Sequence, residues 1–102
     1  MTVPLEKSHT FGPTTPTTRD ITIGDLLKEA AKECPDQLAI ITGVNEIEKR
    51  RHWTYAELYN QAQVAAHAIL ENFEPGERIS VWAPNIPEWV ILEFASALAG
   101  TI

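Results

Sequence analysis

A short strand followed by an apolar helix is the feature that most restricts how this chain can fold. Residues 79–83 read as a buried strand, and residues 86–99 predict a helix that is apolar on almost every side. A crossover helix returns the chain to the same sheet, so Thr101 and Ile102 are expected to begin the parallel neighbour of that strand. We therefore expect an α/β fold and interpret the chain as the opening piece of a larger protein.

The first twenty residues differ in composition from the rest. They carry prolines and a cluster of threonines between positions 14 and 18, and such a segment cannot bury an apolar face. We interpret residues 1–20 as a flexible leader arm and residues 21–102 as a partial amino-terminal subdomain, truncated at its carboxyl-terminal end.

Start and stop signals then mark the helices. Thr22 is a predicted cap with Asp25 at the reciprocal position, and the apolar spacing runs until Pro35. Thr54 repeats the signal with Glu57 in a capping box. The predicted apolar stripe of the first helix consists of Ile23, Leu26, Leu27, Ala30, Ala31 and Cys34, and the staples are Ile21 with Leu26 and Trp53 with Leu58. The predicted apolar stripe of the second helix consists of Tyr55, Leu58, Ala62, Ala65, Ala66, Ile69 and Phe73.

Extended segments lie between these helices. Residues 38–42 and the residues around His52 and Trp53 suggest a hairpin, joined by a charged turn at 44–51. We interpret the basic run at 49–51 as part of a solvated loop, because glutamates precede it. In the third helix, Asn85 is the predicted cap and Glu88 its capping partner, with Pro87 tolerated in the first turn.

Composition narrows the class of protein. The formal net charge of −6 argues against a nucleic-acid surface, and the apolar stretches are too short to span a bilayer. Residues 1–18 lack the apolar core of a secretory signal, so the expected location is cytoplasmic. The single cysteine excludes an internal disulfide framework.

The candidate chemical groups each have a structural explanation. The glycines are isolated, so no phosphate-binding loop is expected. Glu57 and Glu88 fit capping roles, and Cys34 fits a packing role. Surface or packing roles are also expected for His9, His52 and His67. Asn85 is the least settled residue, because ligands bind beyond the carboxyl ends of strands in open α/β sheets. We expect no catalytic, cofactor-binding or metal-binding residue here.

Four segments in this order resemble the amino-terminal part of AMP-forming acyl-CoA synthetases. They are Trp53-Thr54-Tyr55-Ala56-Glu57-Leu58, Pro75-Gly76-Glu77-Arg78-Ile79, Ala83-Pro84-Asn85-Ile86-Pro87-Glu88-Trp89, and Ala97-Leu98-Ala99-Gly100-Thr101-Ile102. The resemblance implies an incomplete amino-terminal subdomain of the adenylate-forming ligase fold, a mixed sheet with packed helices. Among adenylate-forming enzymes, the resemblance is greatest to fatty-acid CoA ligases, because of Pro84-Asn85 followed by Glu88-Trp89.

The resemblance implies a reaction for the parent protein. A carboxylic acid and ATP would give an acyl adenylate and pyrophosphate, and coenzyme A would then release AMP. ATP, Mg²⁺ and coenzyme A are cofactors of that parent, and its phosphate loop, magnesium-binding Glu, ribose-binding Asp and catalytic lysine come later in family sequences. The expected partner of this chain is the remainder of the parent, and the segment alone is expected to be inactive.

Two alternatives stay open. The chain could be a self-contained noncatalytic α/β interaction module that binds a partner through helix 86–99. It could also be part of a peptide-synthetase adenylation domain. The sequence decides neither the acid substrate nor the oligomeric state.

Overall fold

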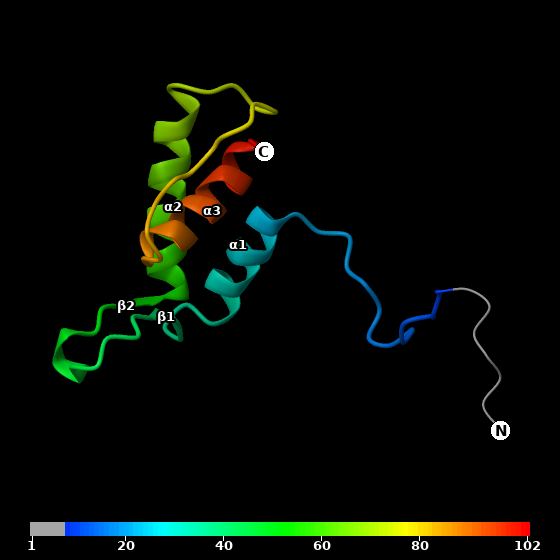
Figure 1. The fold of residues 1–102 in the computed structure, drawn as a ribbon, viewed down its shortest axis with the longest axis horizontal. Helices are drawn as coiled ribbons and strands as arrows, with labels where there is room; N and C mark the ends of the chain where they lie inside the picture. The colour runs from blue at the N-terminus through cyan, green and yellow to red at the C-terminus, as the bar shows by residue number, and fades with distance from the viewer. Residues whose placement is uncertain (1–7) are drawn as a thin grey trace.

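The computed structural model describes residues 8–102, a group of three helices beside a small hairpin (Figure 1). Its elements are α1 (Ile23–Glu33), β1 (Leu38–Ile41), a 3₁₀ helix (Ile47–Lys49), β2 (His52–Thr54), α2 (Tyr55–Leu70) and α3 (Glu88–Ala99). Residues 8–20 contain no helix or strand and their side chains are exposed. Residues 1–7 of the predicted leader arm lie outside the described part, so the arm and its boundary stay a prediction.

The start of α1 follows the sequence signal. The Thr22 side chain accepts a hydrogen bond from the Asp25 amide at 3.1 Å, and its hydroxyl donates to the Asp25 carboxylate at 2.8 Å. The helix ends at Glu33, and Cys34 is its C-cap immediately before Pro35. The predicted cap and stop of this helix are both confirmed.

The buried face of α1 differs from the predicted stripe. Gly24 and Leu27 are buried, whereas Ile23 and Leu26 are exposed. A Cβ atom on Gly24 would lie only 2.9 Å from Cδ2 of Leu98 in α3. The missing side chain therefore lets the backbone of α1 approach α3, and this close packing decides which apolar residues of α1 face inward.

The predicted hairpin is present. Strands β1 and β2 pair antiparallel, with Ile40 opposite Trp53 and Ile41 opposite His52, and an irregularity separates these pairs from Leu38 opposite Thr54. The chain passes from β2 directly into α2. There the Thr54 side chain accepts from the Glu57 amide at 3.2 Å, while the Glu57 carboxylate accepts from the Thr54 amide at 2.8 Å. The predicted capping box is therefore confirmed.

The core lies where α2 crosses α3 and α1 covers the end of the pair (Figure 1). One buried cluster consists of Leu27, Trp53, Leu58, Ala62 and Ile91. A second consists of Ala66, Ile69, Ala95 and Ala99. Alanines at the crossing allow the two helices to lie close, and the larger side chains seal the end next to the hairpin. Most of the predicted α2 stripe is confirmed by these clusters, and Phe73 is exposed beyond the end of the helix.

The predicted strand 79–83 is not a strand in the structure. Its backbone is paired at one end only, because the Ile102 amide donates to the Glu77 carbonyl and the Ile79 amide donates to the Ile102 carbonyl, both at 2.8 Å. This is the pattern of a parallel pair of strands. Thr101 and Ile102 therefore do return beside the first segment, as the crossover argument requires. The side chain of Trp82 is fully exposed, so the expectation that both faces are covered is wrong here.

The start of α3 also differs from the prediction. Pro87 is the N-cap residue and no side chain caps the helix, so Asn85 is not the cap. The first-turn amides of Trp89 and Val90 instead donate to the carbonyls of Ile86 and Pro87. At the other end, Gly100 has φ 72° and forms the left-handed C-cap, a conformation that glycine adopts without strain.

Candidate functional site

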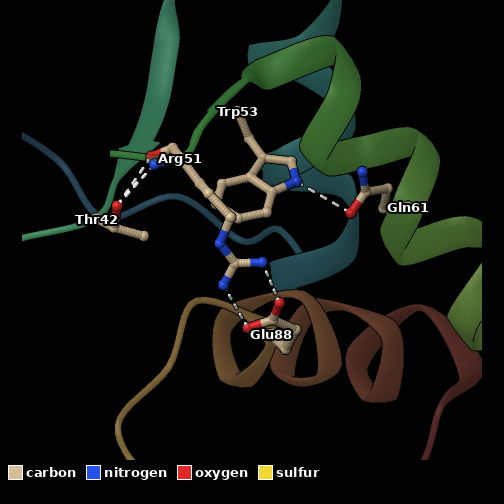
Figure 2. Close-up of polar contacts among 5 residues, drawn as sticks. All are labelled: Thr42, Arg51, Trp53, Gln61 and Glu88. Carbon is tan, nitrogen blue, oxygen red and sulfur yellow. Dashed lines mark hydrogen bonds and ion pairs between the residues drawn. The ribbon is translucent and has the colours of Figure 1, made fainter. Parts of the chain in front are cut away.

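A connected group of polar side chains joins the hairpin to the first turn of α3 (Figure 2). Arg51, just before β2, forms a two-pronged ion pair with the Glu88 carboxylate, with nitrogen–oxygen distances of 2.6 and 3.1 Å. The guanidinium carbon of Arg51 lies 5.1 Å from the centre of the Trp53 ring, within reach of a cation–π interaction. Residues separated by 37 positions are thereby held together.

Hydrogen bonds from the hairpin and from α2 hold Arg51 and Trp53 in place. The Thr42 hydroxyl accepts from the Arg51 amide at 2.8 Å, and the Thr42 amide donates to the Arg51 carbonyl at 2.9 Å. On the other side, the Trp53 indole N–H donates to the Gln61 side-chain oxygen at 3.0 Å (Figure 2). Trp53 is buried, and it belongs to the same apolar cluster as Leu58, which confirms the predicted staple.

Both carboxylates near the hairpin accept hydrogen bonds that favour their ionised form. Hydrogen bonding from Arg51 lowers the pKa of Glu88, and the same contact raises the pKa of Arg51. The Thr54 backbone amide lowers the pKa of Glu57. Both carboxylates are thus held in the ionised form, which makes them acceptors and poor proton donors. Neither has the raised pKa of a general acid.

A hollow of about 610 Å³ lies beside the joint, between the hairpin and residues 85–87. Asn85, the residue that the sequence left least settled, lines it together with Lys49 and Arg51. Both cations are already paired, because Lys49 lies 3.2 Å from the Glu46 carboxylate and Arg51 binds Glu88. The remaining lining is mainly aliphatic. The hollow therefore offers no unpaired cation for a phosphate group.

No metal-binding cluster appears within residues 8–102, since nowhere do three or more His, Cys, Asp or Glu side chains gather. The same described residues include no helix with the length and apolar character needed to cross a membrane. What the described polar contacts do is hold the hairpin against α3 and α2.

Comparison with known proteins assigns the chain. Residues 27–102 match the family described as AMP-binding enzyme. This chain belongs to the AMP-binding enzyme family. It is 32% identical over 99 residues to the mitochondrial medium-chain acyl-CoA ligase ACSF2 of Danio rerio, and the aligned region covers 96% of this chain and 16% of that protein. It is 35% identical over 81 residues to triostin synthetase I of Streptomyces triostinicus, covering 78% of this chain and 14% of that one.

The fold agrees with this assignment. The solved N-terminal subdomain of Klebsiella oxytoca NpsA superimposes with a TM-score of 0.70 at 24% identity, covering 79% of this chain and 20% of that one. The AMP-binding chain thus has the α/β fold of the amino-terminal subdomain of adenylate-forming ligases. It spans about a sixth of the length of its acyl-CoA ligase relative.

The candidate residues of this AMP-binding chain take mainly structural positions. His52 and His67 are exposed, and His9 is exposed with its ring 4.8 Å from that of Phe11 in an edge-to-face contact. Cys34 is half-buried and its thiol donates to the Ala30 carbonyl at 3.2 Å. The exposure of the three histidines agrees with the surface positions predicted for them, whereas the buried packing role predicted for Cys34 is not confirmed, since Cys34 belongs to neither buried cluster. The expectation that no site residue lies in this segment stays a prediction.

The capping role predicted for Glu88 is wrong, and one ion pair was not predicted. Glu88 does not cap α3 but pairs with Arg51, because the hairpin brings a guanidinium within reach of its carboxylate. Residues 49–51 are exposed, so their interpretation as a solvated loop is confirmed, but the ion pair of Arg51 with Glu88 was not predicted. The sequence did contain a signal for the other contact of Arg51, the one with Trp53. Arg51 precedes Trp53 by two positions, so in an extended segment the two side chains share a face.

Proposed function

We propose that this chain supplies the amino-terminal scaffold of a fatty-acid CoA ligase. In the proposed reaction, a fatty acid attacks the α-phosphate of ATP to form an acyl adenylate and release pyrophosphate. The thiol of coenzyme A then displaces AMP from the carbonyl carbon to give acyl-CoA. The match of residues 27–102 to the AMP-binding family carries the proposal. The cytoplasmic location expected from the sequence remains part of it.

In this scheme the chain holds other parts of the ligase in place and contributes no reacting group of its own. The cations beside the hollow are paired with carboxylates, so the residues present do not fit a triphosphate. They also do not fit Mg²⁺, which binds carboxylate and phosphate oxygens, because Glu88 is already engaged with Arg51. We therefore assign ATP, Mg²⁺ and coenzyme A to the remainder of the ligase. The chain alone is expected to be inactive.

The evidence that the substrate is a fatty acid is narrower than the evidence for the family. The sequence Pro84-Asn85 with Glu88-Trp89 resembles fatty-acid CoA ligases, and a relative carries the name medium-chain acyl-CoA ligase. The chain is also similar to a protein that carries the name triostin synthetase I, so the ligase name of one relative does not decide against the peptide-synthetase alternative. The two reactions differ in the acid that is activated, so substrate selection separates them.

A noncatalytic interaction module is the second candidate, favoured by a different observation. The side chain of Trp82 is fully exposed beside backbone without partners, and exposed apolar surface marks interaction sites. Such a module would fold alone and bind its partner without the remainder of a ligase chain.

A chimera tests the scaffold role. The segment of the Danio rerio ligase that aligns with this chain would be replaced by residues 1–102, and the ligase lacking that segment would serve as the negative control. We expect release of AMP from the chimera only when ATP, Mg²⁺, coenzyme A and a medium-chain fatty acid are all present. A folded chimera without this activity contradicts the scaffold role.

The isolated chain provides the complementary test. Exchange of labelled pyrophosphate into ATP should stay at the level of the control without fatty acid. Exchange above that control would show that the chain contains a reacting site and would overturn the proposal of inactivity. In the full reading frame of the parent, activity with amino acids but not fatty acids would favour the peptide-synthetase alternative.

A further inference from the structure

The outer part of the hairpin, residues 41–51, has one polar link to the described chain beyond the hairpin. That link is the ion pair between Arg51 and Glu88 (Figure 2). Within residues 8–102, every other hydrogen bond or ion pair of residues 41–51 stays inside the hairpin. The polar contact that places the outer hairpin beside α3 is therefore made by one arginine.

The segment that leads into α3 depends on the same pair. Among the described residues, the hydrogen bonds of residues 80–87 all join near neighbours in the chain. No side chain caps α3, whose first residue is Glu88, and the helix becomes buried only from Ile91 onward. Arg51 is thus the group that ties the exposed start of α3 to another element.

The pair has the geometry in which a surface ion pair does contribute. Isolated surface pairs add little, and two-pronged arginine–carboxylate pairs are the exception. The Arg51 backbone is fixed by Thr42, and its guanidinium lies over the buried ring of Trp53. The Arg51 side chain therefore rests on a fixed surface when it binds Glu88.

The loop at residues 84–87 lies where open α/β sheets bind ligands. Ile79 pairs with Ile102 in the pattern of parallel strands, and the chain runs from Ile79 to this loop before it enters α3. Ligands bind outside the carboxyl ends of such strands. Asn85 of the loop lines the hollow that Arg51 borders on its other side. The pair with Glu88 therefore holds a loop at the edge where chemistry is expected.

We propose that Arg51 is a positioning residue for the ligase reaction. By holding Glu88, Arg51 fixes the loop at residues 84–87 at the carboxyl edge of the sheet, where the substrates of the ligase bind. This role rests on the proposed function. Arg51 itself touches no substrate in this scheme, because its guanidinium is occupied by Glu88.

A distance measurement tests the holding role without any ligase activity. Spin labels at Glu48→Cys and Asn85→Cys, in a Cys34→Ala background, report the separation of hairpin and loop by pulsed electron paramagnetic resonance. Both labelled positions are exposed. We expect a narrow distance distribution that broadens in Arg51→Met.

Arg19→Met is the matched control for this measurement. It removes an ion pair of similar exposure, with Glu29, that lies away from the hairpin and the loop. The distribution should stay narrow in this variant. Equal widths for Arg51→Met and the unsubstituted chain would overturn the proposal.

The chimera described above tests the consequence for catalysis. We expect Arg51→Met to raise the KM of at least one substrate about fivefold, the factor that a well-formed surface pair contributes to an equilibrium. A mere loss of folded enzyme would lower kcat and leave KM unchanged. Arg51→Glu combined with Glu88→Arg should restore most of the loss, because the exchanged charges can pair again.

The two proposals fail in different ways. A folded chimera without activity contradicts the ligase scaffold, and the distance measurement then still decides whether Arg51 holds the loop. An active chimera whose KM values are the same in Arg51→Met and Arg19→Met overturns the positioning role alone.

Discussion

The junction of the hairpin with α2 and the segment that leads into α3 are built in opposite ways. At the junction, Thr54 and Glu57 satisfy each other's amides, and Trp53 is buried with its N–H bonded to Gln61. Before α3, no side chain caps the helix and Trp82 is fully exposed. The groups of the first region are satisfied by contacts within the chain, whereas the second region leaves a large aromatic side chain in solvent. Two regions of one short polypeptide therefore differ sharply in how far their side chains are buried and their helix ends are capped.

The largest expected difference between these regions lies in the burial of their side chains. Leu58 is 2% exposed at the junction, so Leu58→Ala should lower the free energy of unfolding by about 2–5 kcal/mol. Trp82 is larger but has no protein around it, so Trp82→Ala should change stability by no more than about 0.5 kcal/mol. Urea denaturation at concentrations where the chain is monomeric measures both. Equal losses for the two variants would break the comparison.

Helix capping provides the next largest contrast. Thr54→Ala removes the acceptor of the Glu57 amide and should cost about 1 kcal/mol. Asn85→Ala should cost less than about 0.5 kcal/mol, because Asn85 makes no capping bond. Thermal unfolding of the two variants beside the parent chain gives the comparison. A loss for Asn85→Ala as large as that for Thr54→Ala would show that Asn85 caps α3 in solution.

The smallest expected effect concerns the exposed ion pair between the two regions. Arg51 lowers the pKa of Glu88, so Arg51→Met should raise that pKa back toward its usual value. The pKa of Glu57 should stay low, because the Thr54 amide sets it, and it is therefore the internal control. Carbon NMR titration of the glutamate side chains measures both. An unchanged pKa for Glu88 would mean that Arg51 does not hold it.

The pH dependence of stability follows from the same shifts. Both carboxyl groups have a pKa that is lower in the folded chain than in the unfolded chain. Their contribution is therefore fully present above the unfolded-state pKa and is lost as the pH falls through the folded-state pKa. In Arg51→Met, acid should remove less stability than in the parent chain, since the Glu88 contribution is already absent.

Local signals in the sequence predicted the elements near them. The caps at Thr22 and Thr54, the stop at Pro35, the hairpin and most of the α2 stripe are confirmed. These features depend on residues within a few positions of one another, so neighbouring side chains are sufficient to specify them. The return of Ile102 beside Ile79 was also predictable, because a crossover helix constrains where the chain must go.

The sequence by itself determined where helices begin, which residues of α2 form its apolar face, and the family to which the chain belongs. Only the tertiary structure decided which face of α1 is buried, because that depends on the close approach of Gly24 to Leu98. It also decided that Glu88 pairs with Arg51, since their contact requires the hairpin and α3 to meet. Contacts between residues far apart in the chain depend on the relative placement of elements, and helical or strand periodicity carries no information about that placement.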